Sequence, residues 1–396
     1  MNKFSLNRHF VASLAVFGFA QAAHAACDKT LNPGSDVAAA VSSAAAGTTV
    51  CLNPGNYGSQ AFTSIAKSAD VVIQSSSGTG ATLSADIWAS QHLKFQNLTI
   101  SGASVRDASS NVSFVGSTFT GQAVVNASGS NVHILFDTST FDGITVCTNC
   151  YEGRLQIVSG SGVTVTNSHF GGGGESDGIQ IGASGAIIGP GNVFEGLLQG
   201  KYGRHIDSIQ GYGQSNTTIT GNYFTNDTIY VGFYDGGKNE TITNNVFGPS
   251  ATNEQKLQLG SVQGLTFTHN TVKGNFVVAQ GAKSGSARNS NATYTNNIFD
   301  GTSIADTGDQ PGCATNCVYQ SNLFTSSSNA RGTANLIGKP TYTGGASPTT
   351  WAGLALAATS LGYRTALDSH DMGIGYYGPG TTVIAVVPAP TSLRVN

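Results

Sequence analysis

The chain has 396 residues, of which 10% are charged and 52 are glycine, and its formal net charge is −3. Residues 1–25 hold two basic and no acidic residues, so the remainder has 16 basic against 21 acidic residues, a balance of −5. This slight excess of acidic residues argues against a broad basic surface that would bind nucleic acid. After residue 25 no run of eighteen residues is both apolar and uncharged, so we expect no membrane insertion.

Residues 1–25 have the pattern of a secretory signal peptide. Lys3 and Arg8 precede an apolar run that ends at Ala20, and the small residues Ala23 and Ala25 form a cleavage site. A membrane span would be longer and would have different flanks. We therefore expect a secreted protein, periplasmic or extracellular, whose mature chain begins at residue 26.

Six cysteines follow the leader, an even number that suits an oxidising compartment. A zinc site at the two central cysteines is the alternative, although no second close pair and no nearby histidine supports it. Their spacing predicts three local disulfides: Cys27 with Cys51, Cys147 with Cys150, and Cys313 with Cys317.

The start of the mature chain predicts a cap. The alanine-rich segment from Asp36 to Ala46 is helix-prone, and the chain from Gly47 to Tyr57 then turns into a strand. The exposed end of a stack of strands needs a cover, which a short helix would supply.

A short motif then recurs and sets a period. Its anchor is an asparagine followed two residues later by phenylalanine or valine, and successive anchors lie 30, 23, 25, 27 and 25 residues apart. Serine replaces the asparagine in earlier coils, as at Ser117 and Ser168. The asparagines are Asn192, Asn222, Asn245, Asn270, Asn297 and Asn322.

This period fits three short strands per coil joined by polar turns, and helical spacing is absent. The sequence therefore predicts an all-β fold, a single-stranded parallel β-helix with an N-terminal cap helix, over residues 26–380. Residues 381–396 are predicted to be a tail or linker. Asparagine tolerates left-handed backbone angles, and stacked amides can bond from coil to coil, which explains the anchors.

A second column lies fourteen residues before each anchor phenylalanine or valine. Apolar neighbours flank its glutamines, so alternation points the amides outward along one face. They would form either an amide ladder that only stabilises the stack or the lining of a groove for sugar hydroxyls. The column comprises Gln156, Gln180, Gln210 and Gln258, with Phe233 in the remaining coil.

Two coils repeat Asp-x-Ile-Gln in register, beginning at Asp177 and Asp207, with Glu175 and His205 two residues earlier. Adjacent coils lie about 4.8 Å apart, so we expect Asp177 beside Asp207 and Glu175 beside His205. Two carboxylates this close need a shared proton or a cation. Strict alternation would turn the aspartates inward, so we expect them at the turn that enters each strand. Turn capping is the alternative role.

Aromatic and cationic residues surround these two coils. Aromatic faces suit sugar rings and cations suit uronate groups, so this concentration predicts a groove for an acidic polysaccharide between residues 154 and 258. The predicted substrate-binding residues are Arg154, Gln156, Glu175, Gln180, Lys201, Gln210, Tyr230, Tyr234 and Gln258.

The repeat pattern of the whole mature chain resembles the pectate-lyase-like superfamily, whose members are right-handed parallel β-helices. Residues 176–180 resemble the first catalytic-aspartate motif of polygalacturonases, 206–209 their paired-aspartate coil, and 256–258 their Arg-Ile-Lys. Only one aspartate of the pair is present here, and no Gly-His-Gly motif follows. Residues 369–375 resemble the closing segment of the superfamily, and 388–395 resemble a linker into a fibronectin type III module.

The resemblance and the residues together predict a polysaccharide lyase acting by β-elimination on a uronate polymer. Asp177, Asp207 and Glu175 would hold Ca²⁺, and Lys256, Arg204 or His205 would be the base. Alternatively Arg204 or Lys201 neutralises the uronate without a metal. An epimerase shares the first half of this chemistry.

Two other classes remain open. A polygalacturonase-like hydrolase would use Asp177 and Asp207 as acid and base. A non-catalytic carbohydrate-binding protein or adhesin would use the solenoid only as a surface.

Overall fold

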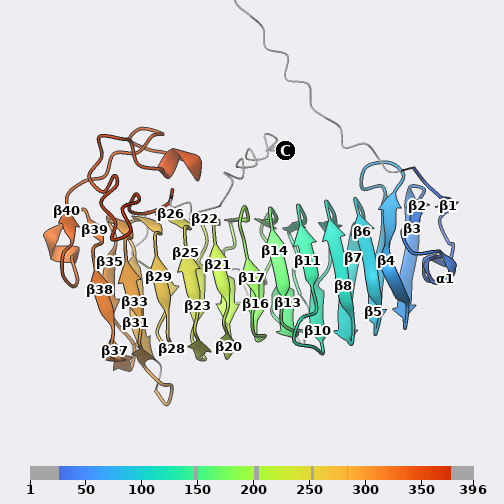
Figure 1. Ribbon diagram of the computed structural model, residues 1–396, viewed down its shortest axis with the longest axis horizontal. Helices are drawn as coiled ribbons and strands as arrows, with labels where there is room; N and C mark the ends of the chain where they lie inside the picture. Colours follow the sequence, from blue (N-terminus) through green and yellow to red (C-terminus); the bar gives the residue numbers. More distant parts are fainter. Residues whose placement is uncertain (1–25, 147–149, 200–204, 251–253, 283, 376–396) are drawn as a thin grey trace, which may run out of the picture.

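The computed structural model describes residues 26–146, 150–199, 205–250, 254–282 and 284–375. Parallel strands stack coil upon coil into one elongated solenoid, with a short helix at its N-terminal end (Figure 1). The predicted right-handed parallel β-helix is confirmed. The predicted leader and tail lie outside the described residues. Within the described part, no helix has the length and apolarity to cross a membrane.

One face of the solenoid is a 13-stranded parallel sheet that extends over nearly all coils. Its strands, in order, are β1 (Lys29–Leu31), β2 (Thr49–Leu52), β4 (Ala66–Ser75), β6 (Gln91–Gln96), β8 (Ser110–Val115), β11 (Ile134–Asp137), β14 (Val163–Thr166), β17 (Ile187–Ile188), β21 (Thr218–Thr220), β25 (Thr241–Thr243), β29 (Thr266–Thr268), β33 (Thr293–Thr295) and β38 (Val318–Gln320).

The anchor motifs form a second parallel ladder, called here the anchor ladder. It comprises β9 (Thr118–Phe119), β12 (Thr140–Asp142), β15 (His169–Gly171), β18 (Val193–Glu195), β22 (Tyr223–Thr225), β26 (Val246–Ser250), β30 (Thr271–Gly274), β34 (Ile298–Asp300), β39 (Leu323–Phe324) and β40 (Leu336–Ile337).

The glutamines lie on a third ladder, called here the glutamine ladder. Its strands are β10 (Ala123–Ala127), β13 (Gly153–Ser159), β16 (Asp177–Ile181), β19 (Asp207–Gly211), β23 (Ile229–Phe233), β27 (Gln255–Gln258), β31 (Val277–Ala282) and β35 (Ser303–Asp306). In the first coils, long bent strands serve both ladders: β3 (Gly55–Thr63), β5 (Ala81–Trp88) and β7 (Thr99–Asp107).

Short elements complete the coils. The strand β36 (Gln310–Pro311) pairs antiparallel with β31, and two 3-10 helices span Ser327–Asn329 and Ala352–Leu354. A five-stranded sheet at one corner contains β20 (Gln214–Ser215), β24 (Gly237–Lys238), β28 (Val262–Gln263), β32 (Asn289–Ser290) and β37 (Cys313–Thr315).

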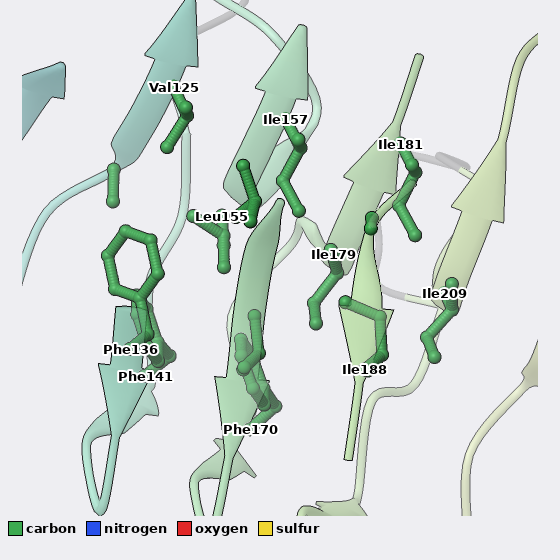
Figure 2. Close-up of a cluster of buried hydrophobic side chains, with 14 of the residues drawn as sticks. Val125, Phe136, Phe141, Leu155, Ile157, Phe170, Ile179, Ile181, Ile188 and Ile209 are labelled. Carbon is green, nitrogen blue, oxygen red and sulfur yellow. The ribbon is translucent and has the colours of Figure 1, made fainter. Parts of the chain in front are cut away.

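Columns of apolar side chains fill the interior. Figure 2 shows Leu155, Ile179 and Ile209 of the glutamine ladder projecting into the same core as Phe141 and Phe170 of the anchor ladder. The anchor phenylalanines stack in nearly parallel pairs, with ring centroids 4.6 Å apart for Phe141 and Phe170. Burial of this continuous column is the main stabilisation that each coil gains from its neighbours.

The anchor asparagines form the predicted amide ladder. The Nδ2 group of each donates to the Oδ1 atom of the next, at 2.9 Å from Asn222 to Asn245 and 3.1 Å from Asn245 to Asn270. The left-handed backbone angle predicted for the anchors belongs instead to the residue before them, such as Asn244 with φ 57° and His269 with φ 52°. The turn is thus made one residue earlier, and the anchor supplies only the ladder.

A helix lies at the N-terminal end of the solenoid, and the C-terminal segment packs along its side. The helix α1 (Val37–Ser43) begins after Asp36, whose side chain accepts a hydrogen bond from the Ala39 N–H group at 2.8 Å, as expected for an N-cap. At the other end, residues 340–375 fold back over the anchor ladder and form a second core cluster around Tyr342 and Met372 (Figure 1).

Two of the predicted disulfides are present, Cys27–Cys51 beside the cap and Cys313–Cys317 in the last coils. Cys147 lies outside the described residues, so the third predicted pair is not described. Disulfides of this kind suit an oxidising compartment.

Candidate functional site

Asp177 and Asp207 are neighbours across two coils. Each is the first residue of its strand, and the Asp207 N–H group donates to Asp177 Oδ1 at 2.8 Å. The second oxygen, Asp177 Oδ2, accepts a hydrogen bond from Gln180 Nε2 at 2.9 Å. Both aspartates are 0% exposed. The expected proximity of the two carboxyl groups is therefore present, but neither lies on an open turn.

The alternation of inward and outward side chains is interrupted directly after Asp177. This interruption directs the aspartates to the outer side. A Cβ atom on Gly178 would meet Phe194 and Leu197 of the core, so two successive residues, Gly178 and Ile179, face inward. Asp177 consequently lies on the same side as Gln180, to which it is bonded. The pair is buried beneath outer-face side chains rather than in the apolar core.

His205 and Tyr234 cover Asp207. His205 Nδ1 lies 3.3 Å from Asp207 Oδ2, and its Nε2 atom lies 3.0 Å from the Tyr234 hydroxyl group. The same hydroxyl is 3.4 Å from Asp207 Oδ1. The side chain of His205 is 50% exposed. A buried carboxylate, an imidazole and a phenol are thus joined in series, and the last two reach solvent.

The burial and charges of this cluster shift its proton affinities. Burial, followed by the charge of Asp207, raises the pKa of Asp177, and burial also raises the pKa of Asp207. Interaction with Asp207 raises the pKa of His205. Burial and the two nearby carboxylates raise the pKa of Tyr234 far above its ordinary value. Tyr234 therefore stays protonated at neutral pH, whereas His205 titrates above its usual range.

The glutamines lie in register, with one exception. Gln156 pairs with Gln180, and Gln180 with Gln210. The next coil places Gly232 in the column instead of the expected Phe233, and Gly232 pairs with Gln258. A Cβ atom at Gly232 would lie 2.4 Å from the Tyr234 ring and 2.9 Å from Asp207 Oδ2, so glycine makes room for both groups.

These amides do not form one uninterrupted ladder. Gln180 Nε2 lies 2.6 Å from Gln210 Oε1, but Gln156 donates to the Tyr212 hydroxyl group at 2.5 Å. Gln258 bonds its own strand, at the Gln255 carbonyl group. The column is therefore available for contacts other than those between coils.

Three predicted site residues face the interior instead. Arg154 is 0% exposed and donates to the carbonyl groups of Phe141 and Gly171, and burial lowers its pKa to about 10. Lys256 donates to the Asp227 carbonyl group at 2.6 Å and lies over the ring of Tyr230, which is itself in the core. Each of these side chains occupies the second position of its glutamine-ladder strand, where the extra inward position falls, and cannot reach a ligand on the outer face.

Sequence patterns did not identify three polar residues near the pair. The charge of Glu152 adds to the raised pKa of Asp177, Asp207 and His205. Tyr212 lies over Gly182 on the outer face. Asp227 is fully buried beneath Ser208, and burial raises its pKa to about 7. Glu152 and Tyr212 belong to turns that the column count skipped.

Three predicted site residues remain. Lys201 and Arg204 lie outside the described residues. Glu175 is half-buried, and its N–H group donates to Thr145 Oγ1 at 3.2 Å.

The residues present do not fit the predicted calcium site. Both oxygens of Asp177 already accept hydrogen bonds from N–H groups, and its side chain is 0% exposed, so it is not open to a calcium ion. Within residues 26–146, 150–199, 205–250, 254–282 and 284–375, no group of three or more His, Cys, Asp or Glu side chains is arranged to hold a metal ion.

A hollow of about 160 Å³ adjoins the cluster on the same face. Tyr234 forms one wall, and Gln258, Ser261 and Asp309 contribute polar groups to the others. The half-buried Tyr234, which contacts His205, therefore stands beside a space lined mainly by polar and small residues.

No protein-family model and no curated protein matches this sequence. Among solved structures, a mannuronic acid-specific family 6 polysaccharide lyase from human gut microbiota has a TM-score of 0.51 at 15% identity, covering 78% of this chain and 82% of its own. A variant of the family 6 alginate lyase AlyGC also has a TM-score of 0.51, at 13% identity, covering 88% of this chain but only 58% of its own. At such identities the likeness shows the fold, a right-handed parallel β-helix that polysaccharide lyases also adopt.

Proposed function

We propose that this chain is a secreted polysaccharide lyase that cleaves a uronate-containing polymer by β-elimination, with His205 and Tyr234 at the reacting sugar. The observation that supports this most is the series of contacts from Asp207 through His205 to Tyr234 on the outer face. The fold shared with polysaccharide lyases and the two disulfides are consistent with it.

His205 is suited to be the base. Asp207 faces Nδ1 and favours the tautomer with its proton there, so Nε2 carries the lone pair, on the side of the Tyr234 hydroxyl group. Elimination begins when a base removes the proton from the carbon next to the uronate carboxyl group. Nε2 would accept this proton, and the imidazolium that forms would be stabilised by the Asp207 carboxylate.

Tyr234 is suited to be the acid. Its raised pKa keeps the hydroxyl group protonated, and the proton is available to the leaving glycosidic oxygen. The carbon–oxygen bond then breaks and a carbon–carbon double bond forms in the sugar ring. The 3.0 Å contact between the two side chains lets the proton on His205 return to Tyr234, which restores the starting state of both groups.

Binding of the polymer would use the outer face of the glutamine ladder. The amides of Gln210 and Gln258 are partly exposed, and the hollow beside Tyr234 extends past Gln258. Lys201 and Arg204 precede His205 in the chain and remain the cations predicted for the uronate. Glu175 remains a predicted substrate contact.

A hydrolase using both aspartates has less support. Asp177 is 0% exposed, and both of its oxygens are hydrogen-bonded within the protein. A general acid or nucleophile must touch the glycosidic oxygen or the sugar carbon, which this carboxyl group cannot do without rearrangement.

The test is an incubation with alginate, polygalacturonate and hyaluronan, with and without EDTA. Ultraviolet absorbance of the unsaturated sugar and reducing ends are followed together. A lyase raises both signals, and we expect His205→Asn to abolish them. The matched control is His169→Gln, because His169 also pairs with an aspartate, Asp142 at 2.7 Å, but lies on the anchor ladder. Reducing ends without absorbance, or full activity of His205→Asn, would refute the proposal.

A further inference from the structure

Trp88 is a large aromatic side chain that the core does not use. It ends the strand β5 and is 45% exposed. The guanidinium group of Arg106 lies 5.1 Å from the centre of its ring. Arg106 is held there by Asp86, through Nε at 3.0 Å and Nη2 at 2.8 Å. Its Nη1 group has no hydrogen-bond partner among the residues that the structure describes.

This group lies on the same outer face as the proposed active site. Trp88 pairs with Arg106, Arg106 with Asn126, and Asn126 with Ser159. Farther along the solenoid, Tyr212 directly follows Gly211 and Tyr234 directly follows Phe233, the last paired residues of their strands. Their rings lie over the outer-face glycines Gly182 and Gly232. Trp88 and Arg106 therefore lie on the outer face that also carries Tyr234, and a β-bulge at Asn126 interrupts the column between them.

The surface between the two groups is polar and carries a further aromatic ring. Asn126 is exposed and Ser159 is half-buried. Tyr151 is 47% exposed and close enough to Tyr212 to affect its pKa. Six strand pairings separate the coil of Trp88 from that of Tyr234, which amounts to about 29 Å at the usual spacing.

We infer that Trp88 and Arg106 form a remote subsite for an anionic sugar residue, which binds a long polymer whose other part occupies the active site. This inference rests on the proposed function. The exposed indole offers a stacking surface for a sugar ring, and the free Nη1 group of Arg106 offers a donor to a carboxylate. The separation from Tyr234 makes the subsite useful only to chains long enough to reach both groups.

The kinetic test compares a polymer with a trisaccharide of the same sugar. Trp88→Ala should raise KM for the polymer by about three- to tenfold, as expected for the loss of one aromatic contact. It should leave kcat for the polymer and both constants for the trisaccharide unchanged, and Trp88→Phe should restore most of the loss. Arg106→Gln should also raise KM for the polymer.

Arg331→Gln is the matched control for the arginine. Arg331 pairs with Asp306 and lies over the ring of Tyr319 at 4.3 Å, so it has the same kind of environment at the opposite end of the solenoid. The KM for the polymer should not change in this variant.

A binding test reports on Trp88 directly, because the chain has only two tryptophans. In Trp351→Phe combined with His205→Asn, Trp88 is the only indole and the polymer should remain intact. Titration with alginate or polygalacturonate should shift the tryptophan emission and protect it from iodide, whereas the trisaccharide should do neither.

The outcomes separate this inference from the proposed function. Cleavage with an unchanged polymer KM in Trp88→Ala, or with unchanged Trp88 emission, overturns the subsite and leaves the lyase. Polymer binding that Trp88→Ala weakens, without any cleavage, supports the subsite and overturns the lyase. Failure of every polymer to bind overturns both.

Discussion

Two rows of side-chain amides run along this molecule, and they differ in kind. The asparagine row is buried, and each of its members from Asn192 to Asn297 donates to the next at 2.9–3.2 Å. The glutamine row faces outward and is interrupted at Gly232. Of its described members, only Gln180 and Gln210 bond within it, and its amides also bond Tyr212 and Asp177. The same pattern of repetition thus marks a scaffold in one row and, in the other, the surface where we propose that chemistry takes place. Interruption of a repeat is the better guide to function.

The largest effect should come from Tyr234, for which the interruption at Gly232 makes room. Tyr234→Phe removes the proposed acid, and we expect turnover to fall by about 10²- to 10⁴-fold, the usual contribution of such a group. Thermal stability should change little, since the ring remains. Tyr223→Phe is the control, because Tyr223 is also half-buried and hydrogen-bonded, to the Thr349 carbonyl group at 3.0 Å. Equal losses in both variants would contradict the assignment.

The two rows should differ next in stability. Asn270→Ala removes the acceptor of the Asn245 N–H group and the amide donor to the Ile242 carbonyl group, at a cost of about 2–4 kcal/mol. Gln258→Ala removes a partly exposed amide and should cost less than about 0.5 kcal/mol. Urea denaturation midpoints of the two variants measure this. Similar shifts in both would mean that the outer row is also structural.

The smallest effect should be a shift in pH dependence. A base must be neutral, so activity should rise as pH increases through the pKa of His205, which lies above the ordinary value of about 6.5. The charge of Asp177 contributes to that raised pKa. Asp177→Asn should therefore move the rising limb to lower pH, and Asp142→Asn, which changes the neighbourhood of His169 instead, should not. A limb that moves to higher pH, or not at all, would argue against His205 as the base.

The scaffold was predictable because its rules are local and repeated. The anchor spacing identified the coils, alternation gave the outward glutamines, and register brought Asp177 beside Asp207. Each of these depends on backbone geometry that is the same in every coil.

The site was less predictable because it lies where that geometry fails. At the start of the glutamine-ladder strands, two successive residues face inward, and this buries Arg154 and Lys256. A one-residue difference in turn length replaces Phe233 by Gly232. Contacts such as that of His205 with Tyr234 join residues 29 positions apart through turns whose shape no periodicity encodes.

The uneven spacing of the anchors has an evolutionary consequence. Coils of 23 to 30 residues stack in register because the asparagine row aligns each new coil, whatever the length of the turns between. Turns can therefore lengthen, shorten or be exchanged without misaligning the coils that follow. Replacement of the turns beside the glutamine ladder, in a lineage or by a protein engineer who grafts them, would change the surface offered to a ligand and leave the stack intact.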